Sequence, residues 1–247
     1  MSWKKDSKAL VVLLHGLFGS PCIWYRQQDL LKQCEGIDVY AAPVYKRGNC
    51  SLEEAAMRIQ KVIENYRTKH PNPIILIGNS NGARVAARVY IDLMKKQESS
   101  PNKYHLHLSL IAGALQGCRT IDCLSDCCLT RFLLDPALRK ELRSDSLHCQ
   151  KLLQAFKRSI KRHNTSVEFY ATLDDTVIPR THSSCPIVVS STAQVYLRET
   201  ESHNSITAAV AKQQVNGIER FLNKVEQQSQ ERCKDSVKLK HLGKVGA

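Results

Sequence analysis

The sequence predicts an α/β fold, and two observations carry this prediction. Short apolar runs bounded by turn residues recur along the chain, as they do in strands that are covered on both faces of a parallel sheet. Amphipathic helical patterns separate these runs, and alternating strands and helices imply right-handed crossovers. The 247 residues are enough for one large domain with a sizeable core. The predicted strands span residues 9–14, 38–45, 73–78, 106–114, 166–173 and 193–199.

Helical patterns occupy residues 51–69, 82–97 and 205–226. The first has the clearest start, because Ser51 is a good N-cap residue and Glu54 stands three positions later, as in a capping box. Apolar residues then recur at spacings of three and four, which places them on one face of a helix. These residues are Ala56, Ile59, Val62, Ile63 and Tyr66.

Residues 116–164 interrupt the alternation, because they contain no strand pattern. Two amphipathic segments are visible there, and we predict a helical cap inserted between strands. The first apolar face consists of Ile121, Leu124, Cys128 and Phe132, and the second of Leu152, Leu153, Phe156 and Ile160. The whole domain is expected to span residues 1–228, followed by a flexible, basic tail over 229–247.

The net charge of +13 predicts attraction to anionic partners. Basic residues cluster at 157–162 and 232–244, but no zinc-finger spacing or aromatic RNA-binding signature accompanies them. We therefore expect no nucleic-acid partner and favour peripheral contact with an anionic membrane.

The amino terminus carries lysines before an apolar run and so looks like a signal peptide at first sight. The likeness is poor, because His15 interrupts the run and Pro21 precedes Cys22, where a small residue would be needed. No run approaches the roughly 18 apolar residues of a transmembrane helix. We expect a cytoplasmic protein with mostly reduced thiols, and signal-independent secretion stays open.

The ten cysteines are irregularly spaced. The densest group lacks paired C-x-x-C units, so no zinc site is expected. This group consists of Cys118, Cys123, Cys127 and Cys128.

The stretch Gly78-Asn79-Ser80-Asn81-Gly82 ends a predicted strand and leads directly into a predicted helix. It fits the pattern G-x-S-x-G, in which a sharp turn lifts the serine hydroxyl clear of the sheet. Ligand and catalytic groups gather at the carboxyl ends of the strands in open parallel sheets. For this motif alone, an ordinary glycine-rich connection is an equal alternative.

Three further stretches follow predicted strands: "LLHGLFGS" (13–20), "ATLDDTVIP" (171–179) and "ESHNSI" (201–206). Together with the serine motif, they make residues 8–226 resemble the α/β-hydrolase family, closest in pattern to its lipases and esterases. The family's chain order of serine, acid and histidine is kept.

The resemblance implies a role for each matching residue. Ser80 would be the nucleophile and His203 the general base. Asp175, with Asp174 as the alternative, would orient the histidine. The backbone N–H groups of Leu17 and Asn81 would form an oxyanion hole.

The sequence departs from the family pattern at three places. Asn79 stands where many lipases have histidine, and Asn81 where methionine, glutamine or leucine is frequent. The Pro-His pair that usually follows the strand at 106–114 is absent. Neither asparagine removes the hydroxyl or the backbone donor, so these changes bear on substrate preference.

The resemblance implies hydrolysis of carboxylic esters, on lipid substrates, through an acyl-enzyme and without metal or cofactor. An acyl thioesterase acting on acyl-protein or acyl-coenzyme A is one alternative, and a catalytically silent binding scaffold is another. The apolar faces of the 116–164 insertion are expected to contact an acyl chain, and the basic face near 157–162 to meet anionic headgroups. The alternative is that these faces simply pack on the domain.

Overall fold

The computed structural model describes residues 3–99, 105–125, 132–144, 146–163, 165–178 and 193–242. Within these described residues, six parallel strands form one sheet in the order β2-β1-β3-β4-β5-β6. All six predicted strands and the α/β class are confirmed. The strands are β1 (Ala9–Leu14), β2 (Ile37–Ala42), β3 (Ile74–Asn79), β4 (Leu106–Ile111), β5 (Ser166–Thr172) and β6 (Ala193–Arg198).

Two strands end three residues earlier than predicted, and each has a local cause. β2 ends before Pro43, which has no N–H group to donate to a ladder. β4 ends before Ala112, whose φ of 43° takes the backbone out of the extended conformation.

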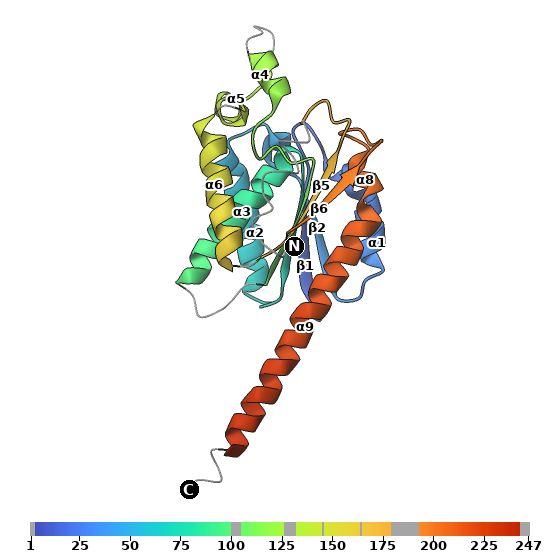
Figure 1. Ribbon diagram of the computed structural model, residues 1–247, viewed down its shortest axis with the longest axis vertical. Helices are drawn as coiled ribbons and strands as arrows, with labels where there is room; N and C mark the ends of the chain where they lie inside the picture. The colour runs from blue at the N-terminus through green and yellow to red at the C-terminus, as the bar shows by residue number, and fades with distance from the viewer. Residues whose placement is uncertain are drawn as a thin grey trace.

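Helices cover both faces of the sheet (Figure 1). One layer contains α2 (Leu52–Arg67), α3 (Asn81–Glu98) and α6 (Leu147–His163), and the other contains α1 (Tyr25–Lys32), α8 (Ile206–Ala209) and α9 (Ala211–Leu242). Successive residues of β1 alternate between the two layers: Leu10, Val12 and Leu14 pack under the first, and Ala9, Val11 and Leu13 under the second. Burial on both sides explains why this strand is apolar throughout.

The start of α2 agrees with its sequence signal. The Ser51 side chain accepts a hydrogen bond from the backbone N–H of Glu54 at 3.2 Å. The apolar face turns toward the sheet, where Ile59, Ile63 and Tyr66 are buried. Three short elements were not predicted: α1, and the 3-10 helices η1 (Pro21–Trp24) and η2 (Tyr45–Gly48).

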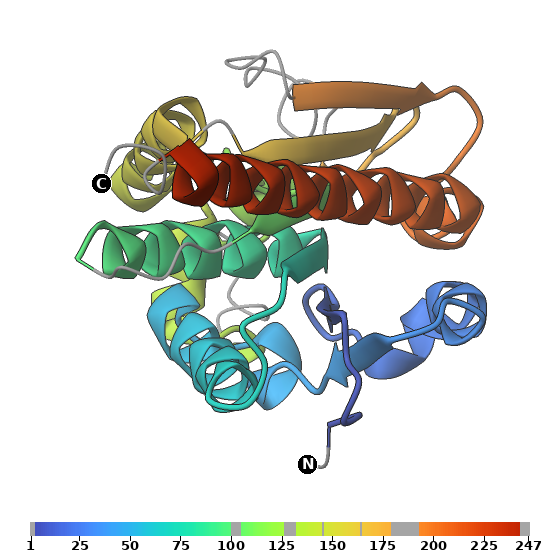
Figure 2. The same ribbon diagram turned by 90° about the horizontal axis from the view of Figure 1, so that it is seen from below.

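The last helix is longer than the predicted 205–226, because α9 ends at Leu242. Its final turns extend past the sheet, and α9 lies in the foreground when the molecule is seen from that end (Figures 1 and 2). Residues 218–242 contain neither glycine nor proline and many strong helix formers, so the backbone can stay helical past the end of the sheet. The domain boundary at residue 228 and the flexibility of 229–247 stay predictions.

The region between β4 and β5 folds into α4 (Arg119–Ser125), α5 (Pro136–Leu142) and α6. The apolar face of α6 packs in the main core, where the ring of Phe156 meets Tyr90 edge-on at 5.8 Å between centroids. The expectation that this face contacts an acyl chain is therefore wrong, and the packing alternative holds for α6. None of the described helices has an apolar stretch long enough to cross a bilayer.

Candidate active site

Ser80 occupies the turn between β3 and α3, in a strained backbone conformation. Its φ and ψ are 54° and −122°, and for a residue other than glycine such a conformation costs about 1–3 kcal/mol. Two neighbours hold it there: the Ser80 N–H donates to the carbonyl of Ile111 at 2.9 Å, and the Ala114 N–H donates to the Ser80 carbonyl at 3.3 Å. The surrounding fold thus imposes this turn.

The two glycines of the motif are required by space. A Cβ atom on Gly82 would lie 2.1 Å from the carbonyl oxygen of Leu14, and one on Gly78 would lie 2.5 Å from the oxygen of Gly82. Both separations are far below van der Waals contact with backbone atoms that cannot move away. The sharp turn predicted from G-x-S-x-G, with its steric need for glycine, is confirmed.

His203 and Asp175 meet beyond the ends of β6 and β5. The Nδ1 atom of His203 lies 2.8 Å from Oδ2 of Asp175, whose side chain is fully buried. The other carboxylate oxygen accepts the backbone N–H groups of Val177 at 2.9 Å and Ile178 at 2.8 Å. The carboxylate is therefore fixed, and it can hold the imidazole with Nε2 directed away from it.

The predicted acid motif also contains Asp174 and Pro179. Asp174 is exposed, and no carboxylate contact between it and His203 is found among the described residues. Pro179, from which the acid position was counted, lies outside the described residues.

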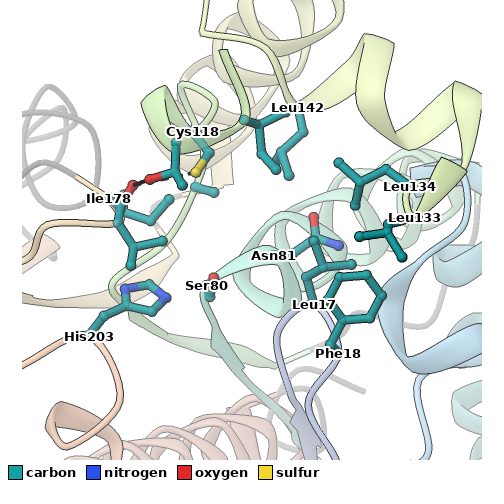
Figure 3. Close-up of a pocket in the computed structure, with 14 residues that line it drawn as sticks. Leu17, Phe18, Ser80, Asn81, Cys118, Leu133, Leu134, Leu142, Ile178 and His203 are labelled. Atoms are coloured by element: carbon teal, nitrogen blue, oxygen red, sulfur yellow. Dashed lines mark hydrogen bonds between the residues drawn. The ribbon is translucent and has the colours of Figure 1, made fainter. Parts of the chain in front are cut away.

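Ser80 and His203 line the same cavity, and the imidazole of His203 points toward Ser80 (Figure 3). The structure thus brings together three side chains that lie far apart in the sequence and follow β3, β5 and β6. This arrangement can support proton transfer from a hydroxyl to an imidazole that a carboxylate keeps oriented.

Leu17 and Asn81 also line this cavity, on the other side of Ser80 from His203 (Figure 3). The loop carrying Leu17 passes very close to Ser80, since a Cβ atom on Gly16 would lie 2.9 Å from that of Ser80. Asn81 is the first residue of α3, where backbone N–H groups lack partners within the helix. Both residues therefore lie at the cavity that Ser80 lines, and their role as an oxyanion hole stays a prediction.

The loop after β1 is tied to the loop after β2. The N–H of Phe18 donates to the carbonyl of Arg47 at 2.8 Å, and the guanidinium of Arg47 donates back to the carbonyls of Phe18 and Gly19. Phe18 and Arg47 both have φ near 55°. These reciprocal bonds hold the Leu17 backbone in place.

His15 supports the same loop from inside the protein, a role that sequence reasoning missed. Its buried imidazole donates from Nδ1 to the Gly16 carbonyl at 2.8 Å and accepts the Val44 N–H at Nε2, at 3.2 Å. Only the neutral ring can make both bonds. Burial lowers the pKa of His15, the Gly16 bond opposes this, and the charge of Arg47 lowers it further.

This lowered pKa predicts a pH effect on stability. The His15 pKa in the unfolded chain is about 6.5, so its contribution to folding is fully present above that pH. As the pH falls below it, the unfolded chain takes up a proton that folded His15 resists, and the free energy of unfolding decreases. Urea unfolding from pH 8 to pH 5 should show a shallower decline in His15→Gln than in wild type. Equal slopes would contradict a neutral, buried His15.

The cavity has a volume of about 280 Å³ and is lined mainly by apolar side chains. α4 contributes Ile121, and α5 contributes Leu142. Of the predicted apolar face of the first cap segment, Ile121 lines the cavity and Phe132 is exposed, whereas the Leu124 side chain and Cys128 lie outside the described part.

The described part of the chain contains no group of His, Cys, Asp or Glu side chains arranged to hold a metal ion. Cys118 lines the cavity, where burial raises the pKa of its thiol. Cys127 and Cys128 lie outside the described residues.

The basic cluster at 157–162 lies far from this cavity. It occupies the last turns of α6, which runs antiparallel to the strands and ends just before β5 begins. The cavity is at the carboxyl ends of the strands, whereas the cluster lies near their amino ends, on the opposite side of the molecule (Figure 1).

No protein-family model and no curated protein matches the sequence. Solved structures match over most of their length. A lipase from Bacillus licheniformis has a TM-score of 0.61 at 12% identity, covering 90% of this chain and 94% of that one. A monoacylglycerol lipase from Paleococcus ferrophilus has a TM-score of 0.55 at 16% identity, covering 87% and 96%.

A bromoperoxidase from Bacillus anthracis matches equally well, with a TM-score of 0.55, 14% identity and coverage of 88% and 92%. Enzymes with different chemistry thus share this architecture, and at such identities the likeness concerns the fold. The six-stranded parallel sheet of the described residues is flanked by helices, and with these matches over most of each chain it shows the α/β-hydrolase fold.

Proposed function

We propose that this protein is a serine hydrolase that cleaves carboxylic esters. The observation that carries the proposal is the 2.8 Å contact between His203 and buried Asp175, beside a serine on a strained turn in an apolar cavity. A strained backbone is retained where the surrounding structure determines it, and such positions cluster at functional sites. A silent scaffold would have no need of all these features together.

The proposed reaction proceeds in two halves. His203 accepts the proton of Ser80 at Nε2 while Oγ attacks the ester carbonyl, and the backbone N–H groups of Leu17 and Asn81 stabilise the oxyanion. The imidazolium then gives its proton to the departing alcohol, which leaves the acyl group on Ser80. Water, deprotonated by the same imidazole, releases the acid and restores the enzyme.

The cavity favours an uncharged acyl group of short to medium length. Its described lining residues include neither lysine nor arginine, and its volume of about 280 Å³ lies just below the range of about 300–1,000 Å³ that is usual for ligand pockets. A series of p-nitrophenyl esters from two to sixteen carbons should give the highest kcat/KM at the shorter half. A maximum at sixteen carbons would contradict this size argument.

Matched oxygen esters and thioesters of one chain length separate the two enzyme classes. We expect oxygen esters to be hydrolysed at least as well as thioesters. A clear preference for acyl-coenzyme A over the matched oxygen ester would instead favour a thioesterase.

We retain peripheral contact with an anionic membrane as a separate proposal. The cluster at 157–162 would hold the molecule with its cavity facing away from the bilayer, so this contact would serve location and not substrate entry. Co-sedimentation with phosphatidylserine vesicles should decrease in a Lys157→Glu, Lys161→Glu double variant while hydrolysis of a water-soluble ester stays unchanged. Equal binding of the variant would contradict this contact.

A further inference from the structure

Arg84 is a cation enclosed in the protein close to the proposed site. It lies in the first turns of α3, four residues after Ser80, and is fully buried. Its Nη1 atom donates to the side-chain oxygen of Asn81 at 3.1 Å, and Nη2 donates to the carbonyl of Glu141 in α5 at 3.1 Å. Its Nε atom has no hydrogen-bond partner among the described residues.

This charge lacks the partner that buried cations usually have. No carboxylate of the described residues forms an ion pair with Arg84. The carboxylate of Glu141 instead accepts the backbone N–H of Leu52 at 2.8 Å. Burial lowers the pKa of Arg84, while Cys149 and the carboxylate of Glu141 act in the opposite direction. A guanidinium is not deprotonated in proteins, so the positive charge remains.

A buried charge without an ion pair in direct contact is costly, and an apolar side chain of similar length could fill the same space without that cost. Arg88 shows the ordinary alternative one turn later in α3, because it is partly exposed and pairs with Asp92 at 2.8 Å. Filling space therefore does not account for a guanidinium at position 84.

The contacts of Asn81 indicate what the charge does. Its side-chain Nδ2 donates to the carbonyl of Gly48 at 3.1 Å, while its oxygen accepts from Arg84. Asn81 is thereby held at both ends, between the loop after β2 and the guanidinium. The backbone N–H of this same residue is a proposed donor to the oxyanion.

We propose that Arg84 is a positioning residue for the oxyanion hole, and that its buried positive charge stabilises the tetrahedral oxyanion through Asn81. This inference rests on the proposed function. A charge kept away from water acts strongly on a developing negative charge nearby, and it needs no rearrangement during the reaction. The bond to Glu141 also joins this residue to α5, which lines the cavity.

Three variants separate charge from packing. Arg84→Gln removes the charge and keeps a polar side chain, Arg84→Lys keeps a side chain that is cationic when protonated, and Arg88→Gln is the matched control on the same helix. We expect Arg84→Gln to lower kcat about 30-fold with little change in KM, and Arg84→Lys to lower it about threefold, on the scale of a weakened oxyanion contact. Arg88→Gln should stay within about twofold of wild type.

Inhibitor binding provides a readout that a purely structural role would not produce. A trifluoromethyl ketone adds to the serine and becomes an oxyanion, whereas the matched methyl ketone binds mainly as a neutral carbonyl. Arg84→Gln should weaken binding of the trifluoromethyl ketone by about the factor lost in kcat and leave the methyl ketone unaffected. Equal weakening of both would mean that Arg84 only shapes the cavity, which would overturn the proposal.

Three further outcomes are decisive. If urea unfolding shows that Arg84→Gln does not fold, Arg84→Met, which removes the charge and keeps an unbranched side chain, takes its place: selective weakening of the trifluoromethyl ketone supports the proposal, and wild-type binding of both ketones overturns it. Wild-type protein without Ser80-dependent hydrolysis would refute the proposed function and this role together. Wild-type hydrolysis with an unaltered, folded Arg84→Gln would refute only the role of Arg84.

Discussion

Replacement of Ser80 by alanine should lower kcat for ester hydrolysis by about 10⁴- to 10⁶-fold and abolish labelling by a fluorophosphonate. The probe forms a bond only with an activated hydroxyl, and Ser80 is the serine whose hydroxyl shares a cavity with His203. Removing this single oxygen atom leaves the glycines, the cavity and the His203–Asp175 contact in place. The loss should therefore fall almost entirely on chemistry.

Ser205→Ala is the matched control for this experiment. Ser205 lies two residues after His203, is exposed, and bonds to Ser202 and Glu201. This variant should be labelled and should hydrolyse esters at rates close to those of wild type. Labelling that persists in Ser80→Ala would place the nucleophile elsewhere, and wild-type protein that is neither labelled nor active would favour the silent scaffold.

The predicted strands were accurate because local patterns dictate them. Covered parallel strands need residues such as those of 9–14 and 73–78, which are apolar on both faces, and few other structures bury such runs. The serine turn was also predictable, because Gly78 and Gly82 are required by contacts within the turn itself and with the adjacent β1.

Whether the apolar face of a helix packs in the core or lines a cavity was harder to predict. α6 shows the same 3.6-residue periodicity whether its apolar side packs on the sheet or lines a cavity. Only the tertiary arrangement, with Phe156 against Tyr90 of α3, decides between these. The length of α9 was missed because residues 229–247 are polar and basic, and such a composition does not distinguish a helix that extends past the sheet from a flexible tail.

Buried polar networks were beyond sequence reasoning. In the sequence, His15 only interrupts an apolar run and belongs to the stretch "LLHGLFGS", and nothing local reveals that its ring bridges Gly16 and Val44. Arg84 looks like an ordinary helix residue in "NGARVAARVY", where Arg88 has the same neighbours. The contact of Arg84 with Glu141 joins residues 57 positions apart, so only the folded chain distinguishes the two arginines.

Replacement of Asp175 by asparagine should lower kcat by about 10⁴-fold, whereas Asp174→Asn should leave it nearly unchanged. The two residues are adjacent and have the same side chain, but only Asp175 is buried and contacts His203 at Nδ1. An asparagine at 175 could still accept the N–H groups of Val177 and Ile178 with its oxygen, which leaves its NH₂ group facing His203.

An NH₂ group in that position would favour the imidazole tautomer with its proton on Nε2, so that His203 could no longer accept a proton from Ser80. The defect should therefore appear in kcat, with the unfolding midpoint in urea close to that of wild type. Measuring kcat for both single variants on one ester decides the assignment. If Asp174→Asn lost activity and Asp175→Asn kept it, the 2.8 Å contact with His203 would have no catalytic meaning, because the exposed carboxylate would then be the one that orients the base.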